Sequence, residues 1–290
     1  VIGRVTFMKM GGVTTYAGLT YRRHGLPTWV VSRVAHAETW ILKRLAAEGI
    51  QVSDDPAETT TRFVNRVRAG RRHQVITSIA PSVNYSQLAA VEPQVDCIHL
   101  GPLHPKDIDE SVFVGLRESR ALVVLDVQGL VREISGSRVA AAVSEHLDAA
   151  LRAAFLVKSD EDELRLILET FGTRVEDLMI RFEIAEWVVT SGFNGGRIYS
   201  GNASVYRYSS EPVSLVVDST GAGDVFLAAY TVARFKNHQT VARASRYAAK
   251  LAASHVSGQY LPHVLAVPRR RTAIRRPSGW YCVDNRINEG

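Results

Sequence analysis

A short glycine-rich turn between two apolar segments constrains this sequence most. The apolar run Leu215–Val217 predicts a strand, and Phe226, Tyr230 and Ala233 recur at the spacing of one helix face. The turn at 218–224 carries two glycines, which let the backbone approach a ligand because they have no Cβ atom. The free N–H groups and the positive dipole end of the following helix favour an anion such as phosphate. The sequence therefore predicts a strand, a turn and a helix built around an anion site.

The last residue of this turn is a carboxylic acid, Asp224. A carboxylate repels phosphate and is a poor ligand for it, but it can take a proton from a hydroxyl group that attacks phosphorus. An anion site beside such a base is the minimum machinery of a kinase. The alternative is structural: Asp218 and Asp224 cap the helix, and the glycines only form the turn.

Four apolar runs, each followed by a polar loop, predict the strands of a parallel sheet. They lie at residues 95–100, 121–126, 154–158 and 186–190. Continuous apolar strands that alternate with helices indicate a sheet buried on both faces, and hence an α/β fold. Because open α/β sheets bind ligands at the carboxyl ends of their strands, we expect Gly101 to line a ligand cleft.

The composition is that of a globular protein, with 46% hydrophobic and 22% charged residues among 290. No apolar run approaches the ~20 residues of a membrane helix, and no signal peptide is recognised at the start of the sequence. Cys97 and Cys282 are too few for a disulfide framework. We therefore expect a cytoplasmic protein without a membrane partner.

The net charge of +6 is concentrated near the C-terminus, where five arginines cluster: Arg269, Arg270, Arg271, Arg275 and Arg276. We accordingly divide the chain into one α/β domain at residues 1–267 and a basic tail at 268–290. The tail is interpreted as a solvated segment, so nucleic acid is not the expected partner. An acidic partner or a polyanion remains the alternative.

The string Asp-Ser-Thr-Gly-Ala-Gly-Asp at 218–224 resembles the signature of the ribokinase-like (PfkB) carbohydrate kinase family. The chain contains no Gly-x-x-x-x-Gly-Lys-Ser/Thr phosphate loop. The resemblance extends over about residues 1–268 and implies a three-layer sandwich, with a mostly parallel central sheet, helices on both faces and a small β lid. We expect lid strands around residues 51–67. The resemblance also suggests a homodimer formed through the lid.

For activity, the resemblance implies transfer of the γ-phosphoryl group of ATP to a hydroxyl of a small sugar or polyol. Asp224 would act as the base, and the N–H groups of Gly221, Ala222 and Gly223 would form the anion hole. Mg²⁺ would be needed, and some relatives also use a monovalent cation such as K⁺. A nucleoside kinase of the same family, or an idle kinase-like module that binds a partner or a polyanion, remains an alternative.

On the donor side, the family motif Asn-x-x-Glu is matched by Asp160 and Glu163, with Asp in place of Asn. The resemblance implies that both carboxylates hold Mg²⁺ through water, and that Asp218 binds the monovalent cation. Residues 190–195 resemble a Thr-x-Gly-x-x-Gly segment beside the nucleotide phosphates. The expected nucleotide contacts are therefore Lys158, Asp160, Glu163, Thr190, Gly192, Gly195 and Thr220.

On the acceptor side, a Gly-Gly pair that opens a helix resembles the sugar-binding region of the family. The expected substrate contacts are Gly11, Gly12, Tyr16, Gly101 and Asp224. Two features depart from the family pattern. Many members have an Asp just after the first strand that holds substrate hydroxyls, and this sequence has none there. A lid segment near residues 7–10 is either truncated or missing from the sequence. Tyr16 stands where ribokinase-type members often have Asn, which argues against ribose as the acceptor.

Overall fold

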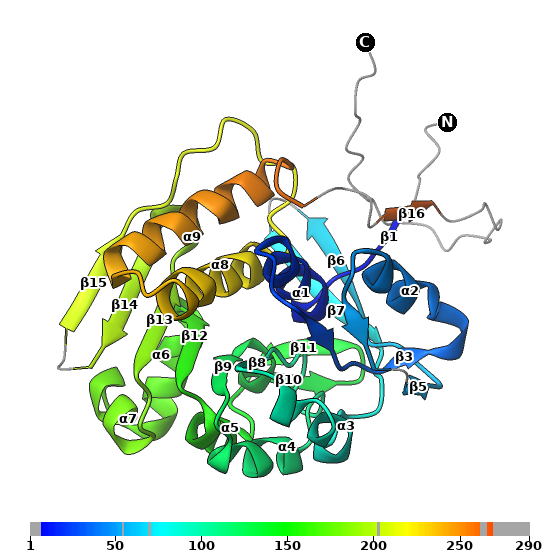
Figure 1. Cartoon of the computed structure of the whole chain (residues 1–290), viewed down its shortest axis with the longest axis horizontal. Coiled ribbons are helices and arrows are strands. Elements are labelled where there is room, and N and C mark those ends of the chain that lie inside the picture. The colour runs from blue at the N-terminus through cyan, green and yellow to red at the C-terminus, as the bar shows by residue number, and fades with distance from the viewer. Residues whose placement is uncertain (1–6, 54, 69–70, 202–203, 262–265, 269–290) are drawn as a thin grey trace.

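The computed structural model describes residues 7–53, 55–68, 71–201, 204–261 and 266–268; the residues before Phe7 and the arginine cluster of the tail lie outside them. Its centre is a six-stranded sheet in the order β15-β14-β13-β12-β9-β8 (Figure 1). The parallel strands are β8 (Cys97–Leu100), β9 (Leu122–Asp126), β12 (Leu156–Asp160) and β13 (Glu186–Thr190). The antiparallel strands β14 (Gly196–Ser200) and β15 (Ser204–Tyr208) complete it. Each of the four apolar runs expected at residues 95–100, 121–126, 154–158 and 186–190 contributes a strand to this sheet, and the predicted mostly parallel sheet is confirmed.

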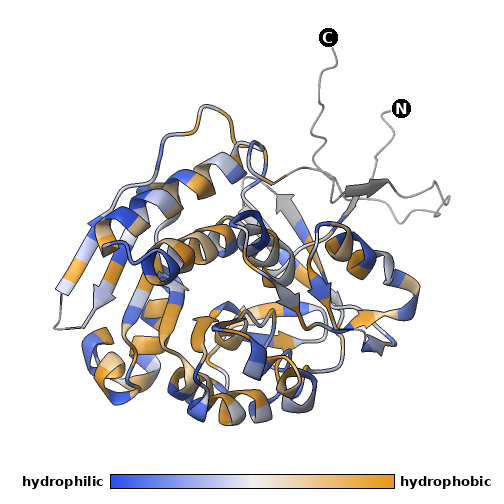
Figure 2. Cartoon of the chain, viewed as in Figure 1, coloured by the Kyte–Doolittle hydropathy of each residue, from blue (hydrophilic) through white to orange (hydrophobic). Residues whose placement is uncertain are grey.

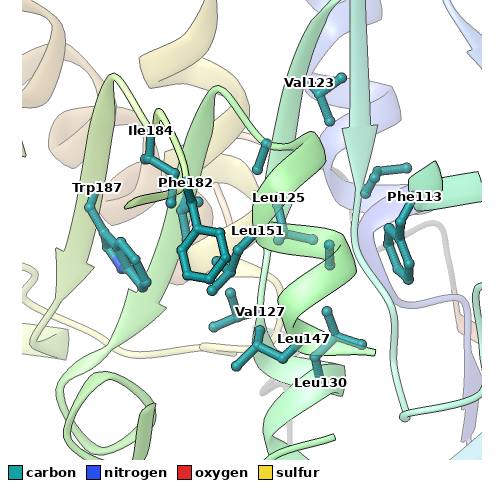
Figure 3. Packing of buried hydrophobic residues seen from close by; sticks show 14 of the residues in the cluster. Phe113, Val123, Leu125, Val127, Leu130, Leu147, Leu151, Phe182, Ile184 and Trp187 are labelled. Atoms are coloured by element: carbon teal, nitrogen blue, oxygen red, sulfur yellow. The ribbon is translucent and has the colours of Figure 1, made fainter. Parts of the chain in front are cut away.

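One face of this sheet packs against four helices. Val123, Leu125 and Trp187 point from the strands into this layer, where they are buried with Phe113 and Leu147 (Figure 3). The helices are α4 (Glu110–Gly115), α5 (Leu147–Ala153), α6 (Glu161–Phe171) and α7 (Val175–Arg181). Burial of these side chains drives the packing of this layer.

The opposite face packs against α8 (Ala222–Thr231) and α9 (Val241–Val256). The strand residues that alternate with those of the first face, such as Val124, Leu156 and Val188, are fully buried against Phe226 and its neighbours. Because successive strand residues point to opposite faces, a sheet covered on both sides needs apolar residues at every position. Figure 2 shows this concentration of apolar residues in the central strands. The result is the expected three-layer sandwich.

The remaining elements stand at the edge of the sandwich. They are β1 (Phe7–Lys9), which pairs with β16 (Ala266–Pro268), and the helices α1 (Val13–Arg23), α2 (Trp40–Ala47) and α3 (Tyr85–Ala89). Both α1 and α2 are followed by a glycine with positive φ, at Gly25 and Gly49. Within the described ranges, no helix is long and apolar enough to cross a membrane.

A second, four-stranded sheet, here called the lid sheet, has the order β10-β11-β7-β6. Its strands are β6 (Arg62–Arg68), β7 (Arg71–Ser78), β10 (Arg132–Ser135) and β11 (Arg138–Ala141). Of the range 51–67 in which lid strands were expected, residues 62–67 lie in β6 of this sheet. Residues 51–57 instead form β4 (Gln51–Val52) and β5 (Pro56–Ala57), which pair in parallel with β2 (Trp29–Val30) and β3 (Val34–Ala35). The second lid hairpin comes from a distant segment, which no local pattern at 51–67 could indicate.

The strand expected at Leu215–Val217 is wrong. These residues belong to the loop between β15 and α8, and Leu215 is 65% exposed. The N–H group of Val217 donates to the carbonyl of Val256 at the end of α9, rather than to a strand edge. The loop therefore reaches the glycine-rich turn by crossing the end of a helix.

Candidate active site

A cleft of about 2130 Å³ opens between the carboxyl ends of the central strands, the starts of α1 and α8, and the lid sheet. Asp224, Gly221 and Gly223 line it on one side, and Gly11 and Gly12 also line it. Pockets for one drug-sized ligand occupy roughly 300–1,000 Å³. The cleft exceeds this range, but it also extends along β8 to Cys97 and Leu122, so only part of its volume lies beside Asp224.

The glycine-rich turn is held in a backbone conformation that only glycine adopts readily. Gly221 is the N-cap residue of α8 with φ +82°, in the left-handed region. A Cβ atom on Gly221 would also lie 2.3 Å from the ring of Tyr16. The N–H group of Ala222 donates to the carbonyl of Ser219 at 3.2 Å. Ala222 is therefore already engaged within the turn, and Gly221 and Gly223 are the better placed of the three expected anion-hole donors.

Two buried side chains support this turn from behind. Tyr16 lines the cleft but is only 1% exposed, because its ring packs against Gly221; its expected contact with the substrate stays a prediction. His255 of α9 places Nε2 2.9 Å from the carbonyl oxygen of Thr220, and its ring meets that of Tyr16 edge-on at 5.3 Å. No local sequence pattern predicts a role for His255, because a single histidine on a helix is not distinctive.

Asp218 is bound on both of its carboxylate oxygens. Oδ1 accepts a hydrogen bond of 2.8 Å from the N–H group of Thr220, and Oδ2 pairs with the ammonium of Lys9. Burial acts to raise the pKa of Asp218, but the hydrogen bonds from Lys9 and Thr220 outweigh it and lower that pKa. Asp218 is therefore ionised, and its counter-ion is the ammonium of Lys9 in the same chain.

Asp224 stands on the first turn of α8 and is partly exposed to the cleft. Burial, and then the negative charge of Asp126, raise the pKa of Asp224 to about 7, against the opposing effect of Lys158. A carboxylic acid with a pKa near neutrality is suited to general-base work, because it is both available as a base and strong enough to accept a proton.

Lys158 lies beneath the turn, at the inner wall of the cleft. Sheet register places it beside Asp126 on the neighbouring strand, and Nζ is 2.9 Å from Oδ2 of Asp126. A Cβ atom on Gly223 would lie 3.2 Å from the same Nζ atom. Burial acts to lower the pKa of Lys158, but the carboxylates of Asp126, Glu163 and Asp224 raise it above its ordinary value. At 5% exposure, Lys158 is a buried positive charge under the anion site.

Asp160 and Glu163 form a reciprocal capping box at the start of α6. Oδ1 of Asp160 accepts from the N–H group of Glu163 at 2.8 Å, and Oε2 of Glu163 accepts from that of Asp160 at 2.7 Å. Burial raises the pKa of Glu163 to about 7. Each carboxylate keeps one oxygen outside the box, which fits a Mg²⁺ ion held through water, since Mg²⁺ keeps most of its water ligands. In the described part of the chain, no cluster of three metal-ligating side chains forms a protein-only cage.

The residues at 190–195 divide between the cleft and the hairpin. Thr190 and Gly192 line the cleft, and Gly192, with φ +56°, has open space where a Cβ atom would lie. Gly195 instead faces the backbone of β15: a Cβ atom there would lie 2.1 Å from the carbonyl oxygen of Tyr208. Gly195 therefore forms the turn and is not among the cleft-lining residues, in contrast to the expectation that it contacts the nucleotide.

The acceptor side is built by close contact between α1 and β8. Gly12 is the N-cap residue of α1, and its carbonyl accepts hydrogen bonds from the N–H groups of Thr15 and Tyr16. A Cβ atom on Gly101 would lie 1.9 Å from Cγ2 of Val13. Gly101 lines the cleft as expected, and it is glycine because α1 approaches the end of β8 there. The lid sheet and its neighbour loop add polar cleft residues that the sequence did not single out: Thr60, Thr61, Asn65, Gln74, Gln128 and Arg132.

Comparison with known proteins gives a consistent result. A structure of a pyrophosphate-dependent kinase in the ribokinase family, complexed with a pyrophosphate analogue and myo-inositol, is 22% identical; the match covers 85% of this chain and 86% of that one, with a TM-score of 0.71. A nucleoside kinase from Burkholderia thailandensis in complex with inosine is 15% identical, with 88% and 85% covered and a TM-score of 0.70. An uncharacterized sugar kinase from Pyrococcus horikoshii in complex with ATP is 18% identical, with 87% and 85% covered and a TM-score of 0.66.

At these identities the three structures show a shared ribokinase-like fold. Among curated proteins, no sequence matches this chain. The sequence model of the pfkB family carbohydrate kinases matches residues 9–261, which include the glycine-rich turn, the central sheet and the lid sheet. The chain belongs to the pfkB family of carbohydrate kinases and is a phosphotransferase.

Proposed function

We propose that this protein transfers the γ-phosphoryl group of ATP to a hydroxyl of a small sugar or polyol, with Asp224 as the base. One observation carries the proposal: Asp224, with its pKa raised to about 7, shares a wall of the cleft with the glycine turn at the start of α8. The carboxylate deprotonates or orients the acceptor hydroxyl as it attacks phosphorus.

The anion site acts on the charge that grows on the transferred group. The N–H groups of Gly221 and Gly223, at the positive end of α8, receive the equatorial oxygens, a contribution commonly worth about 3 kcal/mol per donor. Lys158 adds a fixed positive charge beneath them. Thr190, Gly192 and Thr220 lie along the cleft where the donor phosphates enter. Asp160 and Glu163 would hold Mg²⁺ through water, and the ion would supply positive charge to the donor phosphates there.

The lid sheet supports this acceptor class. Its cleft-lining residues include the neutral hydrogen-bonding groups Asn65, Gln74 and Thr77, beside the apolar Phe63 and Val64 and the charged Arg62 and Arg132. Hydroxyl groups of a sugar or cyclic polyol match this lining. The myo-inositol bound to the pyrophosphate-dependent relative is consistent with such an acceptor. A nucleoside acceptor is the second candidate, because the inosine-bound relative shares the fold.

The test is phosphate transfer measured with a panel of inositols, hexoses, pentoses and nucleosides, each with ATP and, separately, with pyrophosphate as donor. We expect turnover with ATP and a polyol or sugar, and a large loss in Asp224→Asn. Asp162→Asn, an 82% exposed carboxylate on α6, is the matched control. Turnover only with nucleosides would move the assignment to the second candidate, and turnover only with pyrophosphate would overturn ATP as donor.

A protein that turns over no acceptor but binds a partner would be an idle kinase-like module. The arginine tail then becomes the candidate contact, and loss of salt-sensitive polyanion binding on deleting residues 269–276 would identify it. A homodimer formed through the lid sheet remains a proposal that sedimentation of the intact chain tests.

A further inference from the structure

The ion pair between Lys9 and Asp218 joins two segments that are 209 residues apart in sequence and lie next to the anion site. Lys9 is the last residue of β1, and Asp218 opens the glycine-rich turn. Both line the cleft, and their side chains are 29% and 33% exposed. The pair is therefore reachable from the cleft, and it differs from a surface ion pair because it belongs to the wall on which phosphoryl transfer is proposed to occur.

The contacts around Asp218 link this pair to the position of the anion-hole donors. One oxygen of Asp218 holds the N–H group of Thr220, and the other holds the Lys9 ammonium. Thr220 precedes Gly221, whose left-handed backbone begins α8. Lys9 also lies over the ring of Tyr16, with Nζ 5.8 Å from the ring centroid, and that ring packs against Gly221. A displacement of Lys9 would therefore move the turn in two ways, through the hydrogen bond between Thr220 and Asp218 and through the Tyr16 ring against Gly221.

Electrostatics gives the pair a second consequence. A phosphoryl group that enters this site carries negative charge, and the ionised Asp218 would repel it. The Lys9 ammonium neutralises that carboxylate from within the chain. Met10, which follows Lys9 and is 3% exposed, anchors the segment in the apolar cluster that also contains Tyr16. The cation is thus covalently tethered and needs no recruitment from solution.

We propose that Lys9 is a positioning residue that serves as the resident cation of the Asp218 turn, so that the enzyme works without a monovalent metal ion. This inference rests on the proposed kinase activity for its kinetic test, and it replaces K⁺ as the expected ligand of Asp218. Lys9 acts through Asp218 and the turn, and the proposal gives it no contact with the transferred group.

The first experiment compares the intact wild-type chain in KCl, NaCl and tetramethylammonium chloride at one ionic strength. We expect kcat to agree within twofold among the three salts. Lys9→Met, which keeps the length of the side chain but removes its charge, is expected to lower kcat at least tenfold in tetramethylammonium chloride with little change in KM. Saturable activation by K⁺, NH₄⁺ or methylammonium should restore part of that loss. Lys43→Met, at an exposed position of α2, is the matched control: it should neither lower kcat in tetramethylammonium chloride nor respond to added K⁺.

Three kinetic results would overturn the proposal. They are saturable activation of the wild type by K⁺, full activity of Lys9→Met in tetramethylammonium chloride, and a loss in Lys9→Met that appears as a raised donor KM and is not restored by cations. The last result would make Lys9 a direct ligand of the donor phosphates. Lys9→Arg keeps the charge, and its kcat should stay within a few-fold of that of wild type. This variant distinguishes loss of the charge from misfolding caused by substitution at this position.

A melting measurement separates this proposal from the kinase assignment. In Lys9→Met, KCl should raise the Tm by a few degrees relative to tetramethylammonium chloride, because K⁺ binds the vacated carboxylate. Wild type and the double variant Lys9→Met, Asp218→Asn should show no such difference. If no acceptor is turned over, the kinase proposal fails while this comparison still decides the role of Lys9. Equal K⁺ effects on all three proteins would refute it.

Discussion

Replacing Asp224 with asparagine tests the proposal that Asp224 is the catalytic base. The same substitution removes a carboxylate whose ionisation is unfavourable in the folded protein, so it should also change stability. The pKa of Asp224 is raised from an ordinary value near 3.8 to about 7, first by burial and then by Asp126. The folded protein therefore prefers the protonated acid. The contribution of protonated Asp224 to the free energy of unfolding is fully present below pH 4 and is lost as the pH rises through 7.

At pH 8 this difference in pKa corresponds to about 4 kcal/mol at 1.36 kcal/mol per pH unit. Water in the open cleft screens a partly exposed carboxylate, so we expect about 2 kcal/mol. Asp224→Asn should accordingly be more stable than wild type by about 2 kcal/mol at pH 8 and nearly equal at pH 4. Urea unfolding of the two proteins at these pH values measures the difference, with Asp162→Asn as the control.

The same variant should lose activity by about a hundredfold to ten-thousandfold, which is the usual contribution of a positioned base. In wild type, kcat/KM should rise with pH and level off above an apparent pKa near 7, because only the ionised Asp224 can accept the proton. A variant that is as active as wild type, or that is less stable at pH 8, would refute the reasoning. Either outcome would mean that Asp224 serves as a structural cap.

Three further substitutions test the architecture around the site. Gly221→Ala should destabilise the protein by about 1–3 kcal/mol, because it strains a left-handed residue and collides with an aromatic ring; thermal melting and kcat should fall together, and unchanged values would contradict this. Gly101→Ala should lower the Tm through its collision with Val13, and Val13→Ala should restore much of the loss in the double variant; additive losses would argue against the collision. Asp126→Asn leaves Lys158 buried with fewer counter-charges and should cost about 3 kcal/mol in urea unfolding; a neutral effect would show that water reaches Lys158.

The sequence predicted those parts of the fold whose local pattern coincides with their burial. The central strands are buried on both faces, so they are continuous apolar runs and could be located. The turn at 218–224 could be located because its full string resembles the pfkB signature, whereas its glycines and carboxylates alone would also suit an ordinary helix cap. By contrast, Leu215 and Val216 are apolar yet exposed, which reversed the prediction of a strand. Hydrophobicity alone cannot distinguish a strand from a loop without knowing what lies beside it.

The residues that the sequence missed act through contacts between distant segments. His255 reaches the turn from a helix 35 residues further along the chain, and Lys9 reaches Asp218 across most of the chain. Tyr16 was expected in the substrate site because of its position after the Gly-Gly pair, but its position could not indicate that its ring packs against Gly221 in the wall of the cleft. The second lid hairpin at 132–141 alternates half-buried and exposed residues weakly, so its pairing with β7 depends on tertiary structure.

The ring of Tyr16 sits between the two halves of the reaction centre, since α1 carries the acceptor-side glycines and Gly221 begins the anion site. It therefore fixes the gap between α1 and the start of α8. Selectivity for the acceptor can then change by substitution on the lid sheet while this gap stays constant. Such a division would let one chemical step serve many alcohols.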